Sequence, residues 1–158
     1  MKTILIPIFI LMMGFCTAQR YTQQKKEIES IITAVKESII KKDTATFKSL
    51  FTKDSFNWTA VITDKTQQKR IEKDPKATNT FTKNFSNFYS FLLDKGEQEE
   101  IFRNISIENN DVIASVIFDY SFLSNRKASN WGKEFWHLAK INGQWKIISV
   151  IYSLEFNN

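Results

Sequence analysis

The spacing of hydrophobic and polar positions predicts helices in the first part of the chain. Between residues 22 and 42 apolar residues recur every three to four positions, with Lys and Glu elsewhere, as on one face of an amphipathic helix. Asp43 or Thr44 can cap a short second helix that turns Phe47 inward. Residues 55–63 are rich in β-branched and aromatic side chains, and they predict a strand.

Residues 64–95 divide into a polar part and an aromatic part. Residues 64–79 carry Pro75 and show no period, so we expect them to form mostly a loop. Residues 80–95 return to helical spacing, and Gly96 follows as a suitable helix stop. The residues that would share one face of this helix are Phe81, Phe85, Phe88, Tyr89 and Leu92.

From residue 97 onward the period changes to two, which is typical of strands. Residues 99–107 and 112–123 predict a hairpin around the turn at 109–110, in which Ile107 would oppose Val112. This register would place Ile101, Ile105, Ala114, Val116 and Phe118 on one face. The opposite face would then hold Phe102, Asn104, Ser106, Ser115, Ile117 and Asp119.

A second hairpin is predicted at the end of the chain. Residues 131–141 and 144–156 flank Asn142-Gly143, a dipeptide strongly preferred in tight hairpin turns. In a regular register the opposing pairs on one face would be Phe135–Val150, His137–Ile148 and Lys133–Tyr152. On the other face they would be Leu138–Ile147, Trp136–Ser149 and Lys140–Trp145. Both faces carry large apolar side chains. One face must therefore meet the helices, and the other needs a second cover such as a ligand or a partner subunit.

Residues 1–18 have the pattern of a secretory signal peptide. Lys2 precedes an apolar run at residues 4–15, and small residues end the segment, so cleavage is expected after residue 18. The run is shorter than the roughly 20 residues needed to span a bilayer. A lipoprotein cut before Cys16 is the less favoured alternative, because bulky Phe15 precedes the cysteine. Pro7 and Gly14 would interrupt a buried N-terminal helix, which makes that interpretation weaker still.

Composition narrows the class of protein further. Cys16 is the only cysteine, so an exported domain cleaved after residue 18 would have no disulfide, thiol catalysis or cysteine–zinc site. The 14% aromatic content is typical of a folded chain. A formal charge of +5 permits an acidic partner, but acidic residues are interspersed among the basic ones, and we expect no nucleic-acid partner. Without a repeat or linker, residues 19–158 are expected to form a single domain.

The order of elements and two short runs resemble the nuclear-transport-factor-2-like superfamily, which includes the SnoaL-like and ketosteroid-isomerase-like proteins. The runs are residues 47–54 (FKSLFTKD) and residues 135–147 (FWHLAKINGQWKI). The resemblance implies an α+β fold in which three N-terminal helices pack in a strongly curved antiparallel sheet, a cystatin-like cone with an apolar pocket. Such cones isomerise, cyclise, dehydrate, bind or only associate, so function depends on the site.

Three residues are candidates for proton transfer in such a pocket. His137 is the only histidine and could act as acid or base, or could simply be hydrogen-bonded on a half-buried strand. Asp119 could have a raised pKa in an apolar cavity, or could pair with Arg103 or Lys133. Glu134, beside an aromatic residue, allows the same two interpretations.

The remaining candidates are aromatic or amide side chains that could line the pocket. Tryptophan fills an apolar cavity and offers one N–H to orient a ligand, and tyrosine hydroxyls could lie at the mouth. Together with His137, the candidate ligand-binding residues are Asn57, Trp58, Tyr89, Phe118, Tyr120, Phe135 and Tyr152. Each is also explained as part of the core or its rim.

These observations favour an exported, non-catalytic domain that binds a small, largely apolar molecule, as a homodimer formed through the sheet. The alternative is a lyase or isomerase that uses Asp119, Glu134 or His137 as its proton carrier. A second alternative is a protein-association module. The sequence predicts no metal site, no cofactor and no membrane span.

Overall fold

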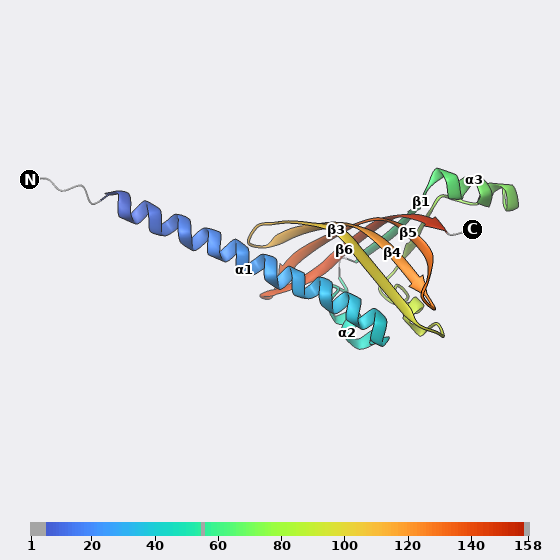
Figure 1. Cartoon of the computed structure of the whole chain (residues 1–158), viewed down its shortest axis with the longest axis horizontal. Helices are drawn as coiled ribbons and strands as arrows, with labels where there is room; N and C mark the ends of the chain where they lie inside the picture. The colour runs from blue at the N-terminus through green and yellow to red at the C-terminus, as the bar shows by residue number, and fades with distance from the viewer. Residues whose placement is uncertain (1–5, 55, 157–158) are drawn as a thin grey trace, which may run out of the picture.

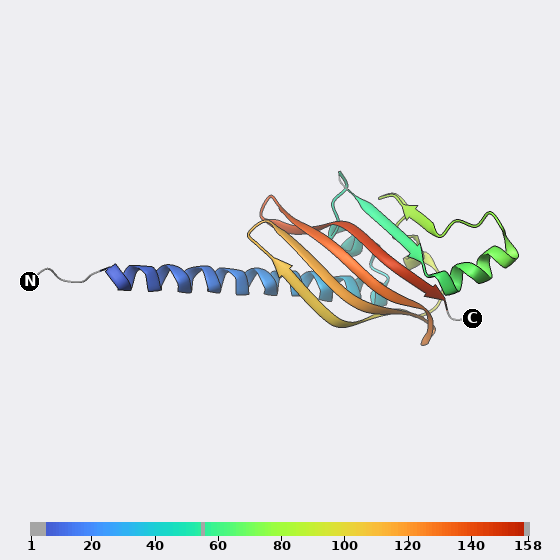
Figure 2. The same ribbon diagram turned by 90° about the horizontal axis from the view of Figure 1, so that it is seen from above.

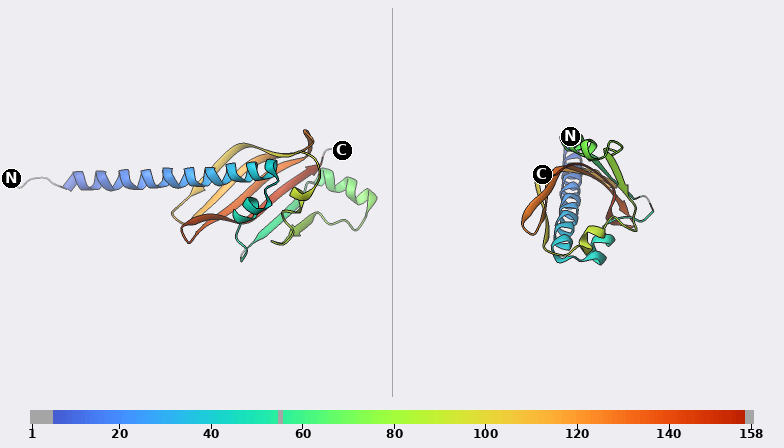
Figure 3. Two further views of the ribbon diagram at one scale, coloured as in Figure 1. Left: turned by 90° about the horizontal axis from the view of Figure 1, so that it is seen from below. Right: turned by 90° about the vertical axis from the view of Figure 1, so that its right-hand side faces the viewer.

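The computed structural model describes residues 6–54 and 56–156, with side chains placed from Tyr21 onward. One six-stranded sheet, in the order β2-β1-β6-β5-β4-β3, curves around the C-terminal part of α1 (Figure 1; Figure 3). The helices are α1 (Ile6–Lys41), α2 (Thr44–Ser49) and α3 (Asp64–Lys73), with a 3-10 helix η1 (Ser90–Leu93). The strands are β1 (Asn57–Ile62), β2 (Thr80–Lys83), β3 (Gln98–Asn109), β4 (Ile113–Ser124), β5 (Lys127–Ile141) and β6 (Gln144–Phe156).

The α+β fold class with a strongly curved sheet is confirmed. The strand pairings are antiparallel with one exception, because β1 runs parallel to β6. The concave face of the sheet holds the core, and α1 packs there against β3 and β6. Figure 3 shows the sheet arching over this helix when the molecule is viewed end-on.

The predicted amphipathic helix forms, and its apolar stripe is buried. Ile28, Val35 and Ile39 are almost completely inaccessible to solvent. The helix is longer than residues 22–42, because it continues without a break to Ile6 and extends beyond the sheet (Figure 2). The expectation that Pro7 and Gly14 interrupt it was wrong; proline is tolerated in the first helical turn, where its missing N–H has no intrahelical partner. None of the described helices is long and apolar enough to cross a membrane.

The expected signal peptide falls partly outside the described residues, which begin at residue 6. Cleavage after residue 18, and the division into residues 1–18 and 19–158, stay predictions.

The predicted second helix is α2, and its cap is Asp43. One carboxyl oxygen of Asp43 accepts a hydrogen bond from the backbone N–H of Thr46 at 2.9 Å, as an N-cap does. Phe47 and Phe51 are buried and pack against each other with ring centroids 5.1 Å apart. They begin an aromatic cluster that continues to Phe88. The helix therefore anchors one end of the concave face.

The prediction for residues 64–79 was wrong in part, because they include helix α3. This helix is almost entirely polar, so it produces no hydrophobic period; only Thr66 is buried within it. Side chains tie it to the loop that follows: Gln67 donates to the carbonyl of Ala77 at 2.6 Å, and Arg70 donates to that of Thr78 at 3.0 Å. Local hydrogen bonds, rather than core packing, hold this helix in place.

The helix predicted over residues 80–95 is also absent. The segment instead forms strand β2, a turn and η1. Asn84 Oδ1 accepts from the backbone N–H and the hydroxyl of Ser86, and Asn87 Oδ1 accepts from the N–H of Asn84. Such local bonds compete with a helix. The aromatic residues still reach the core, but from a turn rather than from one helical stripe.

Both predicted hairpins form, but each contains a β-bulge that the sequence pattern does not reveal. In the β3–β4 pair Ile107 opposes Val116 rather than Val112, and the register shifts between Arg103 and Ser106. Asn104 within this bulge has a φ of 54°. Because of the shift, Phe102 is buried on the same side as Val116 and Phe118, although it was predicted to lie on the other face from them.

The β5–β6 hairpin changes register between His137 and Leu138. On the turn side of the bulge the prediction is confirmed, with Leu138 opposite Ile147 and Lys140 opposite Trp145. Beyond the bulge the pairs are displaced by one residue from the predicted register. The observed pairs there are Glu134–Tyr152, Phe135–Ile151, Trp136–Val150 and His137–Ser149. The extra residue lies in β6, so Val150 and Tyr152 face the concave side together with Ile147. Along β5 the alternation is unbroken, with Glu134 and Trp136 inward and Phe135 and His137 outward.

Candidate functional site

A cavity of about 230 Å³ opens in the concave face, beyond the end of the helical core. Its walls come from β1, β2 and the four long strands, together with the segment around η1. Aromatic rings form most of the wall, in Trp58, Phe81, Phe88, Phe91, Tyr120, Phe122, Tyr152 and Phe156. The other lining residues are Lys83, Glu100, Asn130, Glu134 and Leu154. An apolar enclosure with a few convergent polar groups is the usual form of a small-molecule site.

Glu134 is the most deeply buried carboxyl of this cavity, with 4% of its surface exposed. Its Oε1 accepts a hydrogen bond from Trp136 Nε1 at 2.6 Å, two residues further along the same face of β5. Among the described residues its other oxygen has no hydrogen-bond partner. Burial raises the pKa of Glu134 to about 7, and the Trp136 hydrogen bond opposes this rise. The side chain can therefore gain or lose a proton near neutral pH.

Glu100 is a second carboxyl in the same cavity. It projects from β3, whose next inward residue along the strand is buried Phe102. Burial raises the pKa of Glu100 well above its usual range, and the charge of Glu134 raises it further. Two carboxyls in one apolar enclosure cannot both ionise cheaply, so the pair titrates as a unit. Neither forms an ion pair among the described residues.

Tyr120 lies on the strand between the two carboxyls. Its hydroxyl donates to the carbonyl oxygen of Ser153 at 3.0 Å, which fixes the ring in the cavity wall. The backbone around Ser153 can lie this close to β5 only because residue 132 is glycine: a Cβ on Gly132 would lie 2.0 Å from the same carbonyl oxygen. Burial, followed by the charges of the two glutamates, raises the pKa of Tyr120. The phenol is therefore a fixed neutral group and not a proton carrier near neutral pH.

Tyr152 and Trp58 form the neighbouring wall. Their rings meet edge to face at 6.2 Å between centroids. Burial raises the pKa of Tyr152 to about 12, and the neighbouring Trp58 side chain opposes this rise. Lys83 lines the cavity from β2, but its Nζ donates to Ser90 Oγ at 3.1 Å. The ammonium group is thus engaged away from the carboxyl pair.

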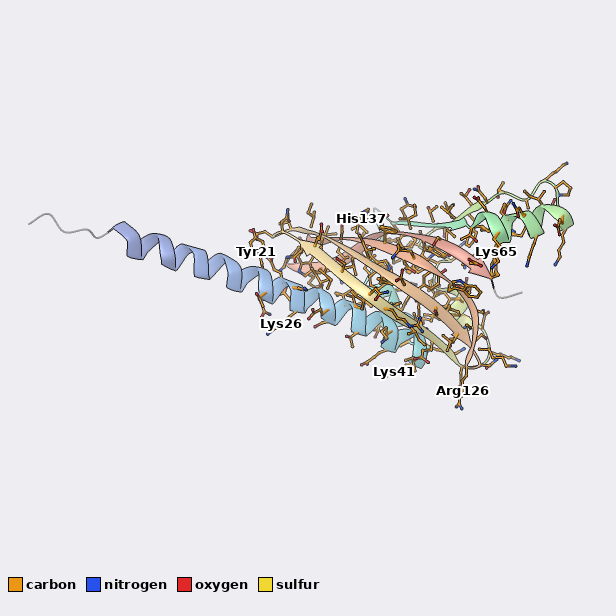
Figure 4. All side chains as sticks on the ribbon, turned by 45° about the horizontal axis from the view of Figure 1, so that its top comes forward. Tyr21, Lys26, Lys41, Lys65, Arg126 and His137 are labelled. Atoms are coloured by element: carbon orange, nitrogen blue, oxygen red, sulfur yellow. The ribbon has the colours of Figure 1, made fainter. Side chains whose placement is uncertain are left out.

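The structure brings some of the predicted site residues together and separates others. Trp58, Tyr120, Tyr152 and Glu134 share the cavity. Phe135 and His137 do not, because they alternate along β5 with the buried residues Glu134, Trp136 and Leu138; both lie on the convex face, where His137 is exposed (Figure 4). Their predicted place in the pocket was wrong, because the face of β5 that meets the core is the one that carries Leu138.

Asp119 also lies on the convex face, where it pairs with Lys133, the alternative to a place in the cavity. Lys133 Nζ donates to its Oδ1 at 2.5 Å, and Asn104 Nδ2 donates to its Oδ2 at 2.7 Å. These hydrogen bonds, with Lys133 contributing most, lower the pKa of Asp119. A partly exposed carboxylate with a low pKa and a cationic partner is a poor proton carrier at neutral pH.

Three further candidates lie outside the cavity. Phe118 is completely buried in the core, with its ring centroid 4.3 Å from that of Phe102. Tyr89 packs under Lys48, whose Nζ lies 4.5 Å from the ring centroid. Asn57 is exposed at the start of β1, where its side chain accepts from Thr59. In each case this contact within the protein explains the position of the side chain without a ligand.

Sequence reasoning missed Glu100, whose pKa is raised by the charge of Glu134 in addition to burial. The only signal was its position two residues before Phe102, which places both on one face of a strand. The predicted register placed that face on the other side from Val116 and Phe118, so the carboxyl was overlooked. Among the described residues there is no group of three or more His, Cys, Asp or Glu that could hold a metal ion.

Comparison with solved structures shows the nuclear-transport-factor-2-like fold. An NTF2-like protein of unknown function from Shewanella baltica is 16% identical, with a TM-score of 0.63 over 87% of this chain and 98% of that one. A Novosphingobium aromaticivorans protein, provisionally described as a scytalone dehydratase, is 13% identical, with a TM-score of 0.64 over 89% of each chain. An NTF2-like protein with a cystatin-like fold, also from N. aromaticivorans, is 8% identical, with a TM-score of 0.66 over 90% of this chain and 88% of that one.

No family model matches the sequence. No curated protein matches it either. At these identities the structural likeness defines the fold and leaves the chemistry to be argued from the cavity.

Proposed function

We propose that this chain is a binding domain for a small, largely apolar molecule, which it holds in the aromatic cavity with a polar group directed at Glu134. The observation that carries the proposal is the combination of apolar walls with the carboxyl of Glu134, one oxygen of which has no hydrogen-bond partner among the described residues. An unpaired polar group among apolar walls costs free energy unless a ligand or water satisfies it. A ligand with a matching group removes that cost, and its apolar body gains from burial against the rings.

The test is retention of a ligand by protein purified from its own host. Native mass spectrometry should reveal an added mass that disappears on denaturation. Leu154→Phe enlarges a side chain of the wall and should abolish the added mass, whereas Ile151→Phe on the convex face of the same strand should leave it. Equal retention by both variants would place the ligand elsewhere and contradict the proposal.

A second function, acid–base catalysis by a lyase or isomerase, is favoured by one observation. The pKa of Glu134 is raised to about 7, where a carboxyl exchanges protons most usefully at neutral pH. Of the three proton carriers considered, only Glu134 lies in the cavity. Incubation of the retained ligand in deuterated water distinguishes the two functions. Deuterium on a carbon of the ligand, lost in Glu134→Gln, indicates catalysis, and an unlabelled ligand indicates binding alone.

We also infer that the domain forms a homodimer through its convex face. Ile117, Phe135 and Ile151 are cross-strand neighbours on β4, β5 and β6, and they make a row of apolar side chains there. Phe135 is 37% exposed and Ile151 is 42% exposed. Contiguous apolar surface of this kind favours association. Light scattering should give twice the monomer mass, and a strict monomer would contradict the inference.

Export remains part of the proposal. The N-terminal segment supports it by its charge, apolar run and small residues. Mass spectrometry of the N-terminus of protein from the host should give Gln19 as the first residue. A first residue of Met1, or a lipid-modified Cys16, would contradict cleavage after residue 18.

A further inference from the structure

We propose that the cavity selects an organic ammonium ion with a small apolar body, for which Glu100 and Glu134 supply the counter-charge. This inference rests on the proposed binding function and names the chemical class of the ligand.

The first reason is a pair of carboxyls without a cationic partner. Glu100 and Glu134 line one enclosure, and no cationic side chain lies within ion-pair distance of either among the described residues. Lys83, the cation of the lining, donates instead to Ser90. A buried carboxylate without a cation is costly, so the pair ionises fully only when a cation is supplied. A positively charged ligand would complete the arrangement.

The second reason is the chemistry of the walls. A cation close to the face of an aromatic ring is attracted by the electron density of that ring, most strongly for tryptophan and tyrosine. Trp58, Tyr120 and Tyr152 all line the cavity, and phenylalanine rings form most of the remaining wall. Aromatic walls combined with carboxylates are the recurrent surroundings of ammonium ligands. A neutral apolar ligand would use the rings and leave the carboxyls without a role.

The third reason is size and selectivity. A volume of about 230 Å³ is below the roughly 300–1,000 Å³ of sites for drug-sized ligands, so it suits a molecule with a single ring. An anionic ligand of that size would find no cation there to pair with, and every ionised carboxyl would repel it in a medium of low dielectric constant. The cavity thus discriminates by charge as well as by volume.

The ionisable groups that face Glu134 come from every strand around it. They are Glu100 on β3, Tyr120 on β4, Tyr152 on β6 and Lys83 on β2. The tyrosines have raised pKa values and stay neutral, so near pH 7 the carboxyl pair is the group that responds to a ligand. A bound cation favours the ionised pair, and its binding should therefore release protons.

The experiment compares three one-ring probes of similar size by isothermal titration calorimetry at pH 8: benzylammonium, benzyl alcohol and benzoate. We expect benzylammonium to bind at least tenfold more tightly than the alcohol, and benzoate to bind most weakly. Titration at pH 7 in buffers of different ionisation enthalpy should show proton release with benzylammonium and none with the alcohol. Glu134→Gln and Glu100→Gln should each reduce the preference for the amine, whereas Glu99→Gln, at an exposed neighbouring position, should preserve it.

The outcomes separate this inference from the proposed function. A preference for benzyl alcohol or benzoate overturns the ammonium ligand and leaves a small-molecule site. A preference for benzylammonium that persists in both cavity variants also overturns it, because the charge would then be recognised elsewhere. If none of the probes binds, the inference and the proposed binding function fail together. Thermal melts of both glutamine variants establish that each is folded.

Discussion

Replacing Glu134 by glutamine should stabilise the protein at alkaline pH. The wild-type carboxyl has its pKa raised from the ordinary value of 4.5 to about 7 in the fold. The folded chain therefore holds a proton between these values that the unfolded chain has already released. The contribution of this carboxyl to the free energy of unfolding is consequently greatest below about pH 4.5. It falls as pH rises toward 7, where the folded carboxyl also ionises.

The size of the effect follows from the two pKa values. A rise from 4.5 to about 7 corresponds to a loss of about 3 kcal/mol of unfolding free energy once both states are ionised. Glutamine has nearly the same shape, cannot ionise, and keeps an oxygen that accepts from Trp136 Nε1. Glu134→Gln should therefore match the wild type near pH 4 and exceed it by up to about 3 kcal/mol at pH 8.

Urea denaturation followed by tryptophan fluorescence at pH 4, 6 and 8 measures this difference. Glu99→Gln, an exposed change on β3, serves as the control and should leave the pH profile unaltered. Glu100→Gln should flatten the profile in the same direction, and because the two carboxyls interact, the double variant should gain less than the sum. A Glu134→Gln protein that is equally or less stable than the wild type at pH 8 would refute the reasoning.

Three further variants test other contacts of the site. Trp136→Phe removes the hydrogen bond that opposes the effect of burial on Glu134, so the pKa of that carboxyl, followed by NMR titration, should rise. Gly132→Ala places a Cβ 2.0 Å from the Ser153 carbonyl oxygen, and the overpacking should cost roughly 1–3 kcal/mol in urea denaturation; an unchanged midpoint would contradict the close approach. Phe135→Glu puts a charge into the convex apolar row, and light scattering should show monomers; a persistent dimer would place the interface elsewhere.

The parts of the fold that could be predicted are those in which hydrophobic period and element type agree. The stripe containing Ile28 and Ile39 produced a buried helix, and the Asn142-Gly143 turn produced the last hairpin as expected. Helix α3 could not be predicted in this way, because its residues are polar and local hydrogen bonds hold it. Residues 80–95 have a helical period, but the side chains of Asn84 and Asn87 stabilise a turn there.

The site was harder to predict than the fold, because side-chain direction in a strand depends on register. Two bulges, one in β3 and one in the β5–β6 pair, exchange inward and outward positions along part of each hairpin. The bulge in β3 brings Glu100 and Phe102 to the concave side, and the bulge in β6 brings Val150 and Tyr152 there, although the strands themselves were expected. A β-bulge inserts one residue without a clear signal in the alternation of polar and apolar positions. Tyr120 and Trp58 lie on stretches without such a shift, and their inward direction needed no correction.

The central physical claim is that an apolar cavity holds a pair of carboxyls away from water and open to a ligand. Carbon-13 NMR titration of the glutamate side-chain carboxyls in the free protein tests it most directly. We expect one carboxyl, absent from the spectrum of Glu134→Gln, to titrate near pH 7, and a second, absent from that of Glu100→Gln, to titrate well above 4.5. If every glutamate carboxyl titrates near 4.5, the pair is solvated and the account of the site is contradicted.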